Sequence, residues 1–431
     1  MSGLGGGRLR LPVALRERDF RLFVVVVLAM VLGNQMIAVA IGWQVYDVHH
    51  HAFDLGLIGL LEFAPLLILA IPAGQLSDRI SRRIVIMLAL TLSCGVAGGL
   101  IIVNATDSHV LWPFLLLATL DGTSNALAFP ASRSLPPMLV DREQIGSAMA
   151  IRSVMNQTGQ VGGPALGGLL FAIHPEITYA SSLGLFVLAL SCALAFRVRY
   201  RGGMRSSEPL SAGTLLAGVR FIRGAPILLG AISLDLFAVL FGGAVALLPV
   251  FAQSVLHSGP AGLGVLRSAP ALGAVVAAVV LVRHPLPARA GRVLLCCVAG
   301  FGASIVVFGV SRAFWLSVAA LAISGAFDML SVNIRTTAVT YATPDWVRGR
   351  VGAVEGVFIG ASNQLGAFES GATAALFGAV PAVIAGGAAT VLIAALWSKL
   401  FPALSRLDRM QDLAPGAGAA PPPLEATPEL A

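Results

Sequence analysis

The amino-acid sequence predicts an all-α membrane protein with twelve transmembrane helices, arranged as two six-helix bundles related by pseudo-symmetry. Three observations support this fold class. The chain of 431 residues is 57% hydrophobic and only 11% charged. It contains twelve apolar segments long enough to cross a bilayer, and polar positions recur in its two halves at one fixed offset. A chain with these properties crosses the membrane many times and is built from repeated halves.

The composition excludes an ordinary soluble domain. Charged residues make up about 25% of such domains, more than twice the 11% found here. The first apolar stretch, residues 22–46, is longer than the ~7–15 residues of a signal-peptide core, and it lacks a small-residue cleavage site. We therefore expect it to remain as a membrane-spanning helix. Because membrane topology accounts for the net charge of +7, we expect a lipid bilayer as partner and no nucleic acid.

A membrane-spanning helix needs about 20 mainly apolar residues. By this measure the predicted spans are 20–46, 55–76, 84–104, 111–132, 145–172, 177–197, 226–254, 261–282, 291–310, 313–338, 350–377 and 380–401. The spans around Gly159 and Gly366 have the weakest signal, because glycine contributes little to hydropathy.

The basic residues predict the orientation of these spans. Lys and Arg are enriched in cytoplasmic loops. With the N-terminus inside, 23 of the 28 basic residues fall in inner segments, and the outer loops contain only Arg312. This segregation predicts cytoplasmic N- and C-termini. The large excess of arginine over lysine, with Lys399 as the one lysine, is typical of bacteria with GC-rich genomes. We therefore expect a multi-pass protein of the bacterial inner membrane.

Internal symmetry defines the predicted domains. A shift of 207 residues places Asp121 on Asp328, and it aligns "NQTG" (156–159) with "NQLG" (363–366). We expect an N-terminal bundle at 20–197 and a C-terminal bundle at 226–402. A cytoplasmic segment (1–19), a cytoplasmic linker (198–225) and a Pro/Ala-rich disordered tail (403–431) complete the chain.

Two local motifs resemble those of a known transporter family. The loop "GQLSDRISRR" (74–83) is similar to the G-x-L-a-D-r-x-G-r-k signature of the major facilitator superfamily, with Ser81 in place of the second glycine. The stretch "GQVGGPALGG" (159–168) is similar to the G-x-x-x-G-P-x-x-G-G motif of its drug/proton antiporters. The phrases "WQVYD" (43–47), "RGRVGAV" (348–354) and "NQLGAFESG" (363–371) resemble the branch that holds the enterobactin exporter and macrolide efflux proteins. This resemblance implies the major facilitator fold and export.

The glycine-rich stretch is interpreted as a helix-five seal. Gly159, Gly163 and Gly167 share one helix face, and Pro164 removes a backbone hydrogen bond and allows a bend. Small residues let two helices approach closely. Together with Gly168, these residues would form a smooth strip on the helix, against which a partner helix slides and seals. The alternative is an ordinary tight helix contact.

By the same resemblance, the 74–83 loop is a conformational latch that stabilises the outward-open state. Asp78 would meet the positive N-terminal end of the eleventh span, and Arg133 is a further partner. The latch would comprise Gly74, Asp78, Arg79, Arg83 and Arg133. The alternative is a solvated topological signal, which is the better interpretation of Arg82 and Arg83.

Ionisable residues inside spans are costly and indicate function. Asp121, Asp235 and Asp328 lie within spans four, seven and ten, which line the central cavity in the resembling fold. Arg152 is a candidate partner of Asp121. The proton affinity of a carboxylate depends on burial and nearby charges, so we expect these residues to couple transport to protons. The alternative is a fixed polar network that holds the helices together.

On the first span, Asn34 and Gln35 are candidate substrate contacts. The three consecutive histidines at 49–51 rarely converge on one ion, so we expect no metal. The sequence contains no phosphate-binding loop, no H-E-x-x-H and no G-x-S-x-G elbow. We therefore expect no enzyme and no cofactor, with the proton gradient as energy source.

The predicted function is proton-coupled efflux of a small amphipathic compound, such as a siderophore, a macrolide or another drug-like molecule, by alternating access in a monomer. The alternatives are a proton symporter that imports a nutrient, a membrane-embedded enzyme and a channel.

Overall fold

The computed structural model describes residues 13–106, 110–197, 212–284, 289–408 and 413, without the side chains of 70–79, 212, 214, 215, 345 and 346. Within these ranges every regular element is helical. The long helices of the N-terminal half are α1 (Arg18–His49), α2 (Ala52–Arg79), α3 (Arg82–Ala105), α4 (Leu111–Ser134), α6 (Ile145–Ile173) and α7 (Pro175–Ala195). Two short 3₁₀ helices, at Val13–Arg16 and Arg142–Gln144, and the four-residue α5 (Pro136–Leu139) complete this half.

The C-terminal half repeats the plan. It contains α8 (Ala212–Gly224), α9 (Pro226–Phe241), α11 (Gly259–Arg283), α12 (Ala290–Val310), α13 (Phe314–Ala342), α14 (Asp345–Phe377), α15 (Ala379–Leu400) and α16 (Pro402–Ser405). Each of the twelve predicted spans therefore coincides with a long helix, or with α9 and the short helices that follow it. The part of the predicted linker that the structure describes is α8, which packs against α14.

Nine segments within the described ranges are long and apolar enough to cross a membrane. The helices α4, α6 and α14 are not among them. Glycine, proline and polar residues lower their hydropathy, although their length matches that of the other helices. The number of twelve membrane crossings stays a prediction, whereas the all-helical membrane fold is clear.

The predicted span 226–254 is not one continuous helix. The helix α9 ends at Phe241, and the chain continues as η3 (Ala244–Leu247), α10 (Leu248–Val250) and the π-helical η4 (Phe251–Val255). The break falls on Gly242 and Gly243. A Cβ atom on Gly243 would lie 3.2 Å from the carbonyl oxygen of Gly366 in α14. The glycine pair thus lets two backbones meet at the point where the helix is interrupted.

Each half has its own core. In the N-terminal half α1 packs against α6 and α7, and α4 packs against α2 and α3. In the C-terminal half α13 packs against α11 and α12, and α15 packs against α9 and α12. Many large side chains remain exposed and apolar, among them Ile68, Val282, Trp315 and Leu376. Such a surface is expected where the surrounding solvent is lipid rather than water.

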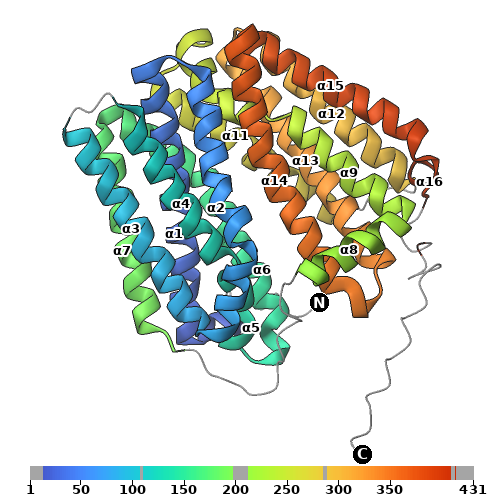
Figure 1. Cartoon of the computed structure of the whole chain (residues 1–431), viewed down its shortest axis with the longest axis horizontal. Coiled ribbons are helices and arrows are strands. Elements are labelled where there is room, and N and C mark those ends of the chain that lie inside the picture. Colours follow the sequence, from blue (N-terminus) through green and yellow to red (C-terminus); the bar gives the residue numbers. More distant parts are fainter. Residues whose placement is uncertain (1–12, 107–109, 198–211, 285–288, 409–412, 414–431) are drawn as a thin grey trace, which may run out of the picture.

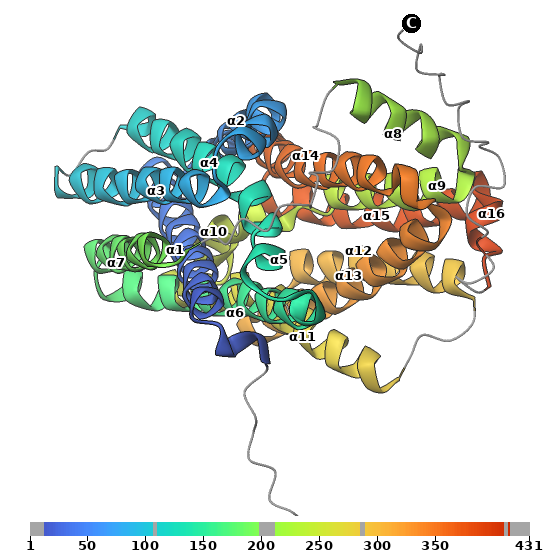
Figure 2. The same cartoon turned by 90° about the horizontal axis from the view of Figure 1, so that it is seen from below.

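The two halves meet at one end of the molecule and diverge at the other (Figure 1). We name the ends after the predicted topology: the outer end carries the α1–α2 turn, and the inner end carries α5 and α8. At the outer end the Tyr46 hydroxyl lies 2.9 Å from the Ser254 hydroxyl, and Gln253 donates a hydrogen bond to Asp47. The view from below places α1–α7 on one side and most of the later helices on the other (Figure 2). The halves therefore contact each other at the outer end and diverge at the inner end.

Candidate transport site

A cavity of about 270 Å³ lies between the two halves. The helices α1 and α2 form its wall on the N-terminal side, and residues of α9, η3, α10, α11 and α14 form the opposite wall. Most lining side chains are apolar. The polar exceptions are one carboxylate, one guanidinium and two amides: Glu62, Arg267, Asn363 and Gln364. A concave, mainly apolar pocket with a few converging polar groups is typical of a small-molecule site.

Close packing of two helices fixes the position of Glu62. The helices α2 and α4 approach so closely that a Cβ atom on Gly122 would lie 2.1 Å from the backbone carbonyl oxygen of Glu62. This approach brings the Glu62 carboxylate near Asp121, which precedes Gly122 on α4. Glu62 interacts electrostatically with both Asp121 and Arg267. The cavity wall therefore carries one acidic group, Glu62, from one half and one basic group, Arg267, from the other half, and Asp121 acts electrostatically on Glu62 from α4.

Arg267 connects the two halves. It lies on α11, and its Nη1 donates a hydrogen bond of 3.3 Å to the backbone carbonyl of Ala38 on α1. No nitrogen of Arg267 lies within 4.0 Å of a Glu62 oxygen, so the two opposite charges form no direct ion pair. Both side chains face the same cavity across this separation.

Asp121 belongs to a short polar network inside the N-terminal half. Its Oδ2 accepts a hydrogen bond of 2.9 Å from Asn125, whose Oδ1 accepts one of 2.7 Å from Asn34. The second carboxylate oxygen of Asp121 and the Oδ1 of Asn34 are buried and have no hydrogen-bond partner. The neighbouring Gln35 donates to Gln160 at 2.6 Å. Asn34 and Gln35 therefore serve contacts within their own half in this conformation.

The structure does not bring Arg152 and Asp121 together. Arg152 lies on α6, which packs against α1, whereas Asp121 lies on α4, which packs against α2 and α3. The Nε of Arg152 is buried without a hydrogen-bond partner, and the positive charge of Arg133 acts on Arg152. Asp328 is half-buried on α13 and forms no hydrogen bond or ion pair within the described part of the chain.

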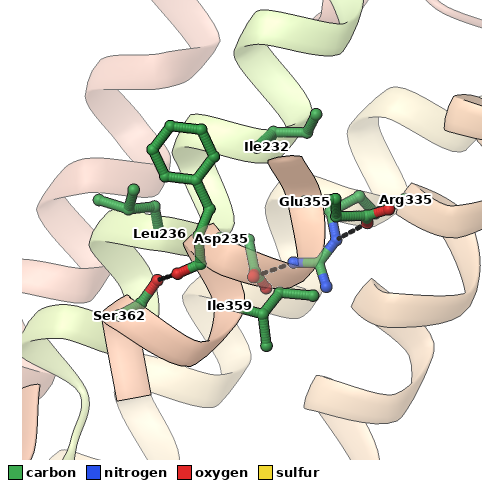
Figure 3. A pocket seen from close by; sticks show the side chains of 8 residues that line it. Ile232, Asp235, Leu236, Arg335, Glu355, Ile359 and Ser362 are labelled. Atoms are coloured by element: carbon green, nitrogen blue, oxygen red, sulfur yellow. Dashed lines mark hydrogen bonds and ion pairs between the residues drawn. The ribbon is translucent and has the colours of Figure 1, made fainter. Parts of the chain in front are cut away.

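Asp235 does not line the central cavity. It forms an ion pair with Arg335, whose Nε also lies 3.4 Å from Glu355 (Figure 3). The three residues come from α9, α13 and α14, and the space between them is too small for a water molecule. Arg335 is only 3% exposed. Two carboxylates thus share one buried guanidinium, and the three side chains link α9, α13 and α14.

The residues of the predicted helix-five seal, which lie on α6, pack against two different helices. Gly159, Gly163 and Gly167 face α1 of the same half, and a Cβ atom on Gly167 would lie 2.8 Å from the Cα of Met36. Gly168 faces α11 of the other half, where a Cβ atom would lie 2.8 Å from the Cα of Gly264. A Cβ atom on Gly264 would in turn lie 2.5 Å from the Pro164 carbonyl oxygen. Among the five residues of the predicted seal, Pro164 and Gly168 are therefore the ones whose close contacts reach the other half.

A second glycine contact joins the halves between α2 and α14. A Cβ atom on Gly371 would lie 2.7 Å from the Cα of Gly56, and one on Gly59 would lie 3.0 Å from the Cβ of Ala367. We call these two contacts, α6–α11 and α2–α14, the glycine seams. Both lie towards the outer end, so they close the cavity on that side.

We predict that Gly168→Leu prevents closure of the outer end. The added side chain would collide with the backbone of Pro260 and Gly264, which cannot rotate away as a side chain can. In a background without the native cysteines, Ala38→Cys in the cavity should become reactive to a membrane-impermeant maleimide from the outer side. Gly162→Leu on the same helix is the matched control, because a Cβ atom there would meet only a Leu32 methyl group at 3.5 Å. Equal labelling of the two variants would contradict the prediction.

The predicted latch lies only partly within the described residues. The side chains of Gly74, Asp78 and Arg79 are outside them. Arg83 donates to the carbonyls of Ala193 at 2.8 Å and Leu194 at 2.5 Å. The guanidinium of Arg133 lies 4.7 Å from the ring centroid of Phe129. Both arginines thus interact within the N-terminal half in this conformation, and the latch role stays a prediction.

Sequence reasoning missed Glu62. It lies inside the predicted span 55–76, and the rule that singled out the three aspartates applies equally to it. Arg267 is an intramembrane charge of the same kind. What the sequence does not reveal is that these two residues, from opposite halves, meet at one cavity.

Two helical bundles around a shared, mainly apolar cavity with a few polar groups are typical of a multi-pass membrane transporter. A family model described as transmembrane secretion effector matches residues 12–427. The chain belongs to this family, which is part of the major facilitator superfamily.

Relatives of known activity agree with this assignment. The chain is 28% identical over 364 residues to the enterobactin exporter EntS of Shigella dysenteriae serotype 1, covering 84% of this chain and 86% of the relative. The EntS protein of Citrobacter koseri is 27% identical over 385 residues, covering 89% and 91% of the two chains.

Solved structures share the fold. A bacterial homologue of the human lysosomal transporter Spinster, in an inward-facing and occupied conformation, has a TM-score of 0.71 at 14% identity and covers 91% of this chain and 97% of its own. A D-xylose–proton symporter has a TM-score of 0.69 at 12% identity, with coverages of 92% and 99%. At such low identity these structures establish the fold alone.

Proposed function

We propose that the protein exports a small amphipathic compound in exchange for protons, by alternating access of the central cavity. The observation that carries this proposal is the cavity between the halves, lined by Glu62 and Arg267 and sealed on the outer side by the glycine seams. Motion of the halves about this cavity would expose it to each side in turn. The exporter names of the relatives support the outward direction.

Protons would act on the acidic groups of the N-terminal half. Asp121 lies beside Glu62, and one of its oxygens is buried without a partner. A carboxylate in this position exchanges a proton when the cavity opens to water. Asp328 at the equivalent position of the other half is a second candidate. Asp235, held by Arg335, is not proposed for this role.

For the substrate we propose a siderophore, a macrolide or a similar drug-like compound. For the location we propose the bacterial inner membrane, with both termini in the cytoplasm and the protein acting as a monomer. The relatives named enterobactin exporter support a siderophore, and the mainly apolar cavity wall supports an amphipathic molecule.

Everted membrane vesicles test both the direction and the coupling. Uptake of radiolabelled enterobactin or erythromycin should rise when respiration acidifies the vesicle lumen, and it should collapse when nigericin dissipates the pH gradient. Vesicles without the protein are the control. Uptake that requires an alkaline lumen would indicate a symporter instead, and uptake that is insensitive to nigericin would contradict proton exchange.

A further inference from the structure

The separated charges of the cavity point to the chemical class of its ligand. Glu62 and Arg267 line the same cavity from opposite halves without a direct ion pair. An unpaired charge in a poorly solvated site is costly, and a ligand group of opposite sign relieves that cost. The space between the two side chains is therefore suited to a ligand that carries both charges.

The hydrogen bonds of Arg267 leave most of its donors free for such a ligand. A guanidinium has five N–H donors, and Arg267 uses Nη1 for the Ala38 carbonyl. This bond anchors the side chain on the opposite half and fixes it at the cavity wall. A planar guanidinium with free donors binds a carboxylate well.

The surroundings of Glu62 favour a cationic group. Asp121 adds a second acidic residue nearby. The Oε1 of Gln364 lies 3.5 Å from the position that a Cβ atom on Gly59 would take, one turn from Glu62 on α2. Asn363 donates its side-chain N–H to Ile359 at 2.8 Å, which leaves its oxygen as an acceptor. Carboxylate and amide oxygens together are suited to an ammonium group.

We propose that the cavity binds a zwitterionic amphipathic compound, with its ammonium group at Glu62 and its carboxylate at Arg267. An ion of one sign gains one of these contacts and is repelled by the other charge, so both charges are needed for tight binding. The remaining walls, among them Ile41, Leu55, Ile58 and Val239, would hold the apolar part. The volume of about 270 Å³ is slightly below the range of roughly 300–1,000 Å³ for drug-sized ligand sites, which suits an amino-acid-like molecule or the headgroup of a larger one.

This inference rests on the proposed function insofar as the cavity is the transport site, but its test needs no gradient. The purified protein in lipid nanodiscs at neutral pH would be titrated with four compounds that share a phenyl group. They are L-phenylalanine as zwitterion, phenethylamine as cation, 3-phenylpropionate as anion and 2-phenylethanol as neutral compound. Binding would be measured by microscale thermophoresis. We expect L-phenylalanine to bind at least about tenfold more tightly than each of the others.

Two variants assign the charges. Glu62→Gln should abolish the preference for L-phenylalanine over 3-phenylpropionate, because the ammonium group loses its partner. Arg267→Gln should abolish the preference over phenethylamine. The matched controls are Glu176→Gln and Arg292→Gln, which neutralise exposed residues outside the cavity and should leave both preferences unchanged.

The four-compound comparison on the unaltered chain decides the question even where a variant fails to fold. A single-charge compound that binds as tightly as the zwitterion would overturn the proposal, as would preferences that survive both variants or an absence of binding by all four compounds. Charge-dependent binding of L-phenylalanine without gradient-driven uptake of radiolabelled L-phenylalanine in vesicles would instead refute the exchange mechanism and leave the ligand class standing.

Discussion

Replacement of Asp121 by asparagine should reduce gradient-driven uptake into everted vesicles roughly tenfold or more, to the level seen without a gradient. Asparagine has nearly the same shape, and its side-chain oxygen can still accept the hydrogen bond that Asn125 donates at 2.9 Å. The substitution therefore removes the group that exchanges a proton while the Asn34–Asn125 contact remains. Gradient-independent exchange of labelled for unlabelled substrate should persist, because it needs the cavity and not the proton.

Two further variants make this result specific. Asp328→Asn tests the equivalent position of the repeat, and Glu176→Gln neutralises an exposed acidic residue at the start of α7. The Glu176→Gln variant should behave like the unaltered protein. If Asp121→Asn retains full gradient-driven uptake, Asp121 has no part in coupling, and Glu62 or Asp328 becomes the proton-exchanging residue to test.

Replacement of Arg335 by methionine should strongly destabilise the protein. Arg335 is 3% exposed and is the shared partner of Asp235 and Glu355. Removal of one member of a buried ion pair costs about 3–5 kcal/mol, because the other charge stays buried without compensation. In detergent we expect the apparent melting temperature to fall by roughly 5–15 °C, measured by the fluorescence of a thiol-reactive dye or by loss of monodisperse elution.

The combination with neutral partners separates charge from packing. A triple variant also replaces the two carboxylates, and it combines Arg335→Met with Asp235→Asn and Glu355→Gln. No uncompensated carboxylate then remains, so most of the lost stability should return. Arg292→Met is the control for loss of an arginine, since Arg292 is exposed at the start of α12. If the Arg335→Met single variant is as stable as this control, the Asp235–Arg335–Glu355 network does not hold α9, α13 and α14 together.

The sequence predicted the fold well because lipid imposes simple rules on it. Each long apolar segment corresponds to a helix, since backbone polar groups in a bilayer must be satisfied within the protein. The interruption after Phe241 escaped prediction for a related reason. Gly242 and Gly243 lower the hydropathy of this strongly apolar segment too little to mark a break, so the span 226–254 looks continuous although its helix ends there.

The site was less predictable, because hydropathy locates a charge along the chain and says nothing of its neighbours. Asp235, Arg335 and Glu355 lie in three different spans, and only their three-dimensional arrangement shows that they form one network. Arg152 was paired with Asp121 because their spans are consecutive, yet α6 packs against α1 instead. The glycines of 159–168 were recognised, but the sequence did not reveal that Gly168 alone among them contacts the other half.

The two charged residues of the cavity have no charged counterparts in the internal repeat. At the 207-residue offset, the counterpart of Glu62 is Ala269 and that of Arg267 is Leu60. The two similar halves therefore differ in charge at the cavity, with an acid on the N-terminal half and a base on the C-terminal half. In a protein made of two identical N-terminal halves, two Glu62 carboxylates would face each other across the cavity, and their negative charges would repel. The two halves are therefore not interchangeable, because the cavity has both an acid and a base only where the two different halves face each other.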